Sequence, residues 1–193
     1  IIILEVGLGG RLDATNIIRP LVTAIVSIDY DHTDVLGDDL ASIAFEKAGI
    51  CKEGIPMLLG SIGEEAFRSI RIVSQMKEAP LLRLYEDFSF RVSEDNRLSW
   101  QGCRHNYTDL RIRMEGEHQK ENASLALAIL EQIDAQFPLS EEGIRSGLQL
   151  GYNPGRLEWI QPNLLVDCAH NPAGASRLAQ YLEEMDRKGR NIT

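Results

Sequence analysis

The carboxylate of Glu5 ends an apolar run that starts at Ile1 and has the length of a strand. A glycine-rich turn over residues 7–10 follows, and its small residues allow a ligand to approach the backbone. Ligands of open α/β sheets bind just beyond the carboxyl ends of the strands. We therefore expect Glu5 to face a bound ligand. Because the chain starts within a predicted core strand, we also expect it to be a piece of a larger protein.

Residues 29–34, with the sequence DYDHTD, gather carboxylates and a hydroxyl around His32. Oxygen donors beside an imidazole are plausible ligands for a hard cation such as Mg²⁺. The same residue types also cap ordinary polar turns. The residues alone favour neither interpretation, but the segment follows a second apolar run, at the kind of position where α/β sites form.

Lys47 falls on the apolar stripe of a predicted helix, at i+7 from Leu40 and i+4 from Ile43. A lysine in such a position extends its ammonium to the surface, or it is paired or modified. If it points into a site, its charge or its pKa can be changed there.

Three further segments place polar groups at the starts of helices or the ends of strands. Gln119 and Asn122 are three apart, so they meet in the first turn of a helix, where polar ligands or simple capping would use them. Arg156 follows a turn, and its forked guanidinium suits phosphate oxygens, although it could also be an ordinary surface arginine. Asp167 ends a strand, where it could bind a ribose hydroxyl or cap a turn.

These residues need an α/β framework, and the apolar pattern predicts one: a mostly parallel sheet flanked by helices, with an antiparallel edge. Alternating apolar residues over 81–114 indicate the antiparallel strands. The turn-forming residues 151–155 are the best linker between two regions, 1–152 and 153–193. We predict strands over 21–28, 56–59 and 164–166, and helices over 38–48, 64–76, 119–133, from Ser140, and from Asn171.

The composition limits the possible partners. A net charge of −9 disfavours binding to polyanionic nucleic acid. The chain has no apolar stretch of membrane-spanning length and no secretory signal, so we expect no membrane partner. The three cysteines show no C-x-x-C pairing, which indicates a reducing compartment, and we expect a cytoplasmic location.

Six segments in order resemble the folylpolyglutamate synthase/dihydrofolate synthase branch of the Mur ligase superfamily. They are EVGLGGRLDATNII (5–18), DHTDVLG (31–37), FEKAGI (45–50), HQKENA (118–123), PGR (154–156) and DCAHNP (167–172). The resemblance implies that 1–152 is part of an ATP-binding central domain. It also implies that 153–193 is the linker and the start of a second, Rossmann-like α/β domain.

The resemblance further implies an ATP-dependent ligase that joins L-glutamate to folate, and to dihydropteroate, through an acyl phosphate. By residue, it implies that Glu5 and His32 bind Mg²⁺ and that Lys47 is carbamylated. It implies a catalytic-site position for His170. Contacts with ATP are implied for Asn122, Arg156 and Asp167, and contacts with the pterin for Leu12, Asp13 and Ala14. The partners are then small molecules, and we expect a monomer.

The family's phosphate-binding loop, which ends in Gly-Lys-Ser, is not found in these residues and should precede Ile1. We therefore expect the longer parent protein to be the enzyme and this chain to be inactive alone. Two alternatives remain at this stage. One is a ligase of UDP-linked cell-wall precursors, and the other is a non-catalytic remnant that binds a ligand or partner.

Overall fold

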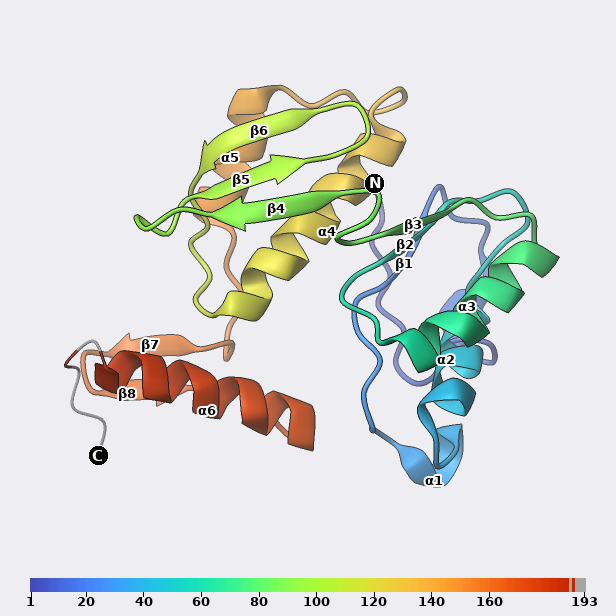
Figure 1. The fold of residues 1–193 in the computed structure, drawn as a ribbon, viewed down its shortest axis with the longest axis horizontal. Helices are drawn as coiled ribbons and strands as arrows, with labels where there is room; N and C mark the ends of the chain where they lie inside the picture. The colour runs from blue at the N-terminus through green and yellow to red at the C-terminus, as the bar shows by residue number, and fades with distance from the viewer. Residues whose placement is uncertain (188, 190–193) are drawn as a thin grey trace.

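The computed structural model describes residues 1–187 and 189 of the chain. A parallel sheet with the order β1-β2-β3 forms its centre (Figure 1). Side chains of the middle strand point alternately to the two faces, as the pleat requires. The side chains of Met57 and Leu59 belong to a hydrophobic core on one face of the sheet, and the side chain of Leu58 belongs to a second core on the opposite face. The strands are β1 (Thr23–Ile25), β2 (Met57–Leu59) and β3 (Leu81–Arg83).

Helices cover both faces of this sheet. The first core contains α2 (Leu40–Ala48) and α3 (Glu64–Met76), and the second contains α4 (Glu117–Ile133). Asp39 begins α2 by accepting a hydrogen bond from the Ser42 amide at 2.7 Å. Two glutamates in the first turn of α3 oppose the positive end of the helix dipole. The predicted helices and the α/β fold class are thereby confirmed.

The antiparallel strands form a sheet of their own, whereas the sequence indicated an edge of the parallel sheet. Leu98 and Trp100 of this sheet are fully buried, and their side chains lie in the same core as residues of α4. The Trp100 indole donates to the carbonyl of Ser124 at 3.1 Å. The sheet consists of β4 (Ser89–Val92), β5 (Leu98–Gln101) and β6 (Asn106–Leu110), with α5 (Glu141–Leu150) beside it.

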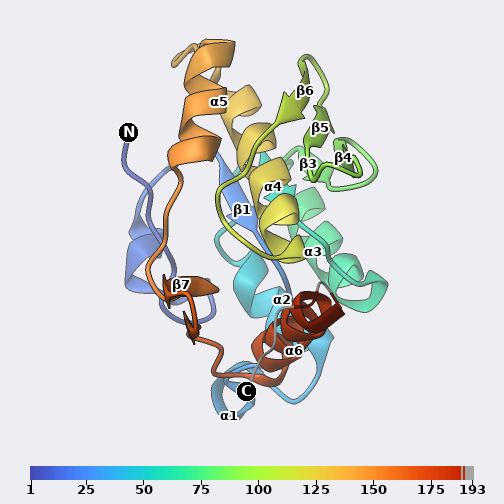
Figure 2. The same cartoon turned by 90° about the vertical axis from the view of Figure 1, so that its left-hand side faces the viewer.

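The C-terminal region is a hairpin of β7 (Glu158–Gln161) and β8 (Leu164–Val166) covered by α6 (Pro172–Arg187) (Figures 1 and 2). The Trp159 indole donates to the Tyr181 hydroxyl at 2.9 Å, which ties the hairpin to the helix. The strand β8 and the helix were predicted, while β7 was not. The end of the predicted second region, residues 188 and 190–193, lies outside the described residues.

Residues 1–6 form no strand, so the prediction of a core strand there is wrong for this structure. Ile1, Ile2 and Ile3 are 79%, 85% and 91% exposed. An apolar run becomes a strand only when a neighbouring strand supplies hydrogen bonds, and no described strand pairs with this one. Two short helical turns complete the fold, η1 (Ala14–Ile17) and α1 (Thr33–Leu36). No helix among the described residues is long and apolar enough to span a bilayer.

Candidate functional site

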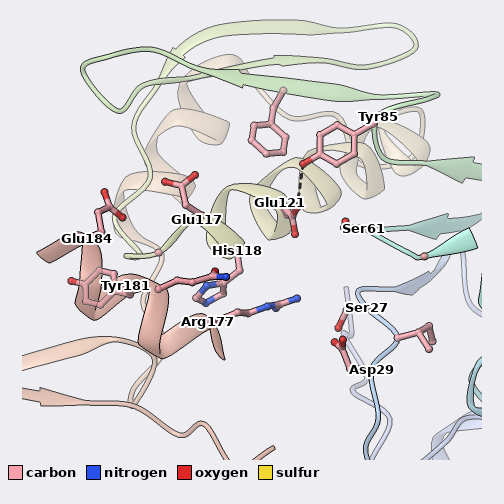
Figure 3. Close-up of a pocket in the computed structure, with 15 residues that line it drawn as sticks. Ser27, Asp29, Ser61, Tyr85, Glu117, His118, Glu121, Arg177, Tyr181 and Glu184 are labelled. Atoms are coloured by element: carbon pink, nitrogen blue, oxygen red, sulfur yellow. Dashed lines mark hydrogen bonds between the residues drawn. The ribbon is translucent and has the colours of Figure 1, made fainter. Parts of the chain in front are cut away.

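A cavity of about 650 Å³ opens where the carboxyl ends of β1 and β2 face the first turn of α4 and the side of α6 (Figure 3). The wall therefore combines the central sheet with the C-terminal region. Carboxylates and cations both line it, which suits a ligand that carries charges of both signs. The ionisable lining residues are the carboxylates of Asp29, Glu117, Glu121 and Glu184, the guanidinium of Arg177 and the imidazole of His118.

His118 lies between the positively charged groups of the C-terminal region. Burial lowers the pKa of its imidazole, and the charges of Arg177 and Arg156 lower it further, against an opposing effect of Asp167. The ring is therefore neutral at pH 7. One of its nitrogens can accept a hydrogen bond, and Nε2 lies 3.1 Å from the Gln119 amide nitrogen.

Asn122 continues this hydrogen-bonded row, because its amide nitrogen donates to Gln119 Oε1 at 3.1 Å. The predicted proximity of Gln119 and Asn122 is thus confirmed. Since Gln119 is buried, the row fixes the polar face that the start of α4 presents.

Asp167 holds the turn that carries Arg156 against the end of β8. Its two carboxylate oxygens accept from the amides of Leu157 at 2.9 Å and Ala169 at 2.8 Å. Leu157 has φ of +46°, a strained conformation that this hydrogen bond helps to hold. Arg156 itself is exposed, so its guanidinium remains accessible to a ligand.

The DHTD and HNP segments meet across the two regions. The side-chain amide of Asn171 donates to Asp31 Oδ2 at 2.9 Å, and this hydrogen bond is the main reason that the pKa of Asp31 is lowered. His32 follows in a left-handed conformation with φ of +50° and is exposed. His170 is exposed as well, and its Nδ1 lies 2.9 Å from the Cys168 carbonyl.

The glycine-rich turn docks on the C-terminal end of α2, beside Lys47. The Arg11 amide donates to the Glu46 carbonyl at 2.9 Å, and the two side chains form an ion pair at 3.0 Å. A Cβ on Gly10 would lie 2.7 Å from the Lys47 carbonyl oxygen, so only glycine fits there. Lys47 is half-buried and has no ion pair with any described residue.

Asp13 is the internal anchor of that turn. Its carboxylate accepts from the amides of Gly7, Leu8 and Thr15 and from the Thr15 hydroxyl, at 2.5–3.2 Å. These hydrogen bonds lower the pKa of Asp13 from 3.8 to about 2. The flanking side chains of Leu12 and Ala14 are exposed.

The predicted site residues thus lie in three places, one of which is the meeting of the DHTD and HNP segments with His32 and His170. Asn122, Arg156 and Asp167 lie around His118, whereas Asp13 and Lys47 meet at the glycine-rich turn. Glu5 is exposed in the irregular segment before that turn. Within residues 1–187 and 189, no three His, Cys, Asp or Glu side chains are grouped as a metal site requires. Glu5 and His32 would therefore give at most part of a coordination shell.

Several cavity residues were not predicted from the sequence. Tyr85 lies at the end of β3, and its hydroxyl donates to Glu121 Oε1 at 3.2 Å. Arg177, Tyr181 and Glu184 come from α6, which was predicted only as a helix from Asn171. Their spacing of three and four residues does mark a second, polar face of that helix, which is the signal that could have indicated them.

The sequence of this chain is similar to those of curated synthases over almost its whole length. The dihydrofolate synthase/folylpolyglutamate synthase of Bacillus subtilis is 37% identical over 95% of this chain and 44% of its own length. The Mycobacterium tuberculosis enzyme of the same name is 40% identical over 93% of the chain and 40% of its length. The chain is homologous to these synthases. No family model matches it.

The synthase fold is also the one that the structure adopts. A folylpolyglutamate synthase solved with AMPPCP and folate superposes with a TM-score of 0.89 at 30% identity, covering 94% of this chain and 46% of that chain. The chain therefore spans less than half the length of the synthases that it matches.

Proposed function

We propose that this chain is part of an ATP-dependent ligase that adds L-glutamate to folate, and to dihydropteroate, with formation of ADP. The observation that carries the proposal is that segments distant in sequence come together. His118 is close enough to Arg156 and Asp167 to be affected by their charges, and Asp31 accepts a hydrogen bond from Asn171. Homology to synthases over 93–95% of the chain supports the same assignment.

Residues of the His118 group are proposed to bind ATP. Asn122 offers an amide at the start of α4, Arg156 an exposed guanidinium, and Asp167 a carboxylate whose oxygens retain further acceptor capacity. A guanidinium binds phosphate oxygens in a forked arrangement and offsets their negative charge. A structural relative was solved with the ATP analogue AMPPCP, in agreement with this proposal.

The turn over residues 7–16 is proposed to bind the pterin. Asp13 accepts four hydrogen bonds from within the turn, so its proposed part is to fix the shape of the turn beside the pterin. Leu12 and Ala14 are exposed beside it and can cover the ring faces.

Glu5 and His32 are proposed ligands of Mg²⁺. An incomplete set of protein ligands is usual for this ion, which keeps water and phosphate oxygens in its shell. The ion, when bound, would offset the charge of the reacting phosphate. Lys47 is proposed to be carbamylated, which would replace an unpaired, half-buried cation with a carboxylate.

The chemistry proposed for the complete enzyme joins a carboxylate to an amine through an acyl phosphate. Anionic groups must approach one another, and Arg156 supplies positive charge for that approach. His118 lines the cavity as a neutral imidazole and can accept a hydrogen bond from a substrate, and His170 is proposed to lie at the catalytic site. Closure of the two regions around the cavity would keep water from the activated carboxyl group.

The direct test is ADP formation from ATP in the presence of glutamate and either dihydropteroate or tetrahydrofolate. We expect turnover by the longer parent protein and none by residues 1–193 alone. Turnover by the isolated chain would contradict the proposed inactivity. Turnover with a UDP-linked cell-wall precursor in place of the pterins would favour the alternative ligase.

A further inference from the structure

Arg177 reaches from α6 into the cavity and forms neither an ion pair nor a hydrogen bond with any described residue (Figure 3). Its side chain is half-buried. Other partly buried arginines of the chain behave differently, since Arg83 pairs with Glu86 and Arg145 pairs with Glu141. A guanidinium that is partly desolvated and lacks a partner in the described part of the chain is suited to an anion from outside the protein.

The surroundings of Arg177 define the charge of that ligand. Its neighbour His118 is neutral, so the positive charge at this wall belongs to Arg177. Glu117 and Glu121 line the cavity from α4, and Asp29 lines it from the end of β1. These carboxylates outnumber the guanidinium of Arg177, so a ligand that fills the cavity beside them should carry a positive charge as well as a negative one. A small zwitterion, with its ammonium toward the carboxylates and a carboxylate on Arg177, fits the charges.

We propose that Arg177 binds a carboxylate of a glutamyl group in this cavity and so selects the amino-acid substrate. The inference rests on the proposed function, because it deepens that reaction by naming the residue that recognises glutamate. The charge argument favours the incoming free amino acid, because the nitrogen of the acceptor's glutamyl tail is an uncharged amide, and binding of that tail is the other outcome that the test distinguishes. The two sources share the carboxylate and differ in which substrate loses affinity when Arg177 is changed.

The test uses the longer parent protein with Arg177→Gln and Arg177→Lys, and Arg187→Ala as the matched control. Arg187 lies on the same helix, is exposed, and pairs with Glu183 at the surface. We expect Arg177→Gln to raise the KM for free glutamate by about 10- to 100-fold. If Arg177 binds the tail of the acceptor instead, the KM for a pteroylglutamate acceptor should rise by this factor and the KM for pteroate should not. Arg177→Lys should retain part of the affinity, and KM for ATP should stay within about twofold.

Calorimetric titration of glutamate and of pteroylglutamate, with AMPPCP present, separates this inference from the proposed function. Loss of binding of a glutamyl compound in Arg177→Gln supports the inference. If the wild-type protein binds that compound but makes no product, the proposed ligase activity is contradicted and the inference is not. Unchanged binding of both glutamyl compounds overturns the inference. A main effect on ATP also overturns it, because Arg177 would then bind phosphate.

Discussion

At the scale of single residues, the side chains of Asp13 and Ser124 differ in how far their hydrogen-bonding groups are satisfied. Asp13 accepts four hydrogen bonds and thereby organises the turn proposed to bind the pterin. Ser124 is fully buried in α4, and its hydroxyl has no hydrogen-bond partner among residues 1–187 and 189. The first residue should stabilise the fold through its charge, whereas the second should weaken it through unmet polarity.

Asp13→Asn should destabilise the protein at neutral pH, because the amide has one acceptor oxygen in place of two and its NH2 group would face a pair of the present donors. The folded-state pKa of Asp13 is about 2, below its ordinary 3.8. The carboxylate therefore contributes stability above its ordinary pKa, and this contribution disappears as the pH falls through about 2. Thermal melts of wild type and variant should differ most at pH 7 and converge in acid. Asp95→Asn, at an exposed aspartate outside the turn, should show no such pH dependence.

Ser124→Ala should raise the free energy of unfolding by about 0.5–2 kcal/mol, because it removes an unpaired hydroxyl and adds a better helix former. Urea denaturation monitored by far-ultraviolet circular dichroism is the measurement, because this signal remains in a variant that lacks Trp100. Trp100→Phe is the contrasting variant, since it removes a hydrogen bond to the Ser124 carbonyl and should destabilise by about 1–3 kcal/mol. A destabilised Ser124→Ala would mean that the hydroxyl does have a partner.

At the scale of elements, the fit of the glycine-rich turn on α2 depends on the lack of a side chain. A Cβ on Gly10 would lie 2.7 Å from the Lys47 carbonyl oxygen and 2.9 Å from Ile50 Cγ2. Since the first of these atoms belongs to the helix backbone, it has little freedom to move. The turn positions Asp13, so its docking connects packing with the proposed pterin site.

Gly10→Ala should therefore lift the turn from α2 and cost about 1–3 kcal/mol. Hydrogen exchange of the Arg11 amide, which donates to the Glu46 carbonyl, should become faster. Gly147→Ala is the matched control, because its Cβ would meet no atom within 4 Å and it lies exposed in α5. That control should stabilise the protein by about 0.5–1 kcal/mol. Equal behaviour of the two variants would refute the role of close approach.

The elements also show what local sequence can predict. The helix Glu64–Met76 was predicted to the residue, because its apolar spacing and its first-turn glutamates agree. The strand Glu158–Gln161 was missed, since so short a hairpin strand has little periodicity and its register shifts near Trp159. Arg177 was missed because its role depends on where α6 lies against the central sheet. That placement is tertiary and leaves no local pattern.

At the scale of the whole molecule, the hydrogen bond from Asn171 to Asp31 joins the C-terminal region to the loop that carries His32. Asn171 also caps α6, because its Oδ1 accepts from the Gly174 amide at 2.8 Å. One side chain thus orients the helix and attaches it to the neighbouring region. The relative position of the two cavity walls depends on this attachment.

Asn171→Asp should keep the cap but place two carboxylates together, and we expect the C-terminal region to separate. Small-angle scattering should report a larger radius of gyration than for the wild type. Adding Asp31→Asn exchanges donor and acceptor and should restore the attachment. The coupling energy in the double-mutant cycle should be about 1 kcal/mol. Additive effects of the two substitutions would show that the contact does not hold the regions together.

The cavity between β1, α4 and α6 has a thermodynamic consequence, because its walls come from regions joined by the irregular segment at Gly151. A molecule that touches both walls binds only when the regions lie together, so its apparent affinity is reduced by the fraction of molecules that are apart. By reciprocity, each bound molecule increases the fraction that is together. Two substrates that never touch would then help one another to bind.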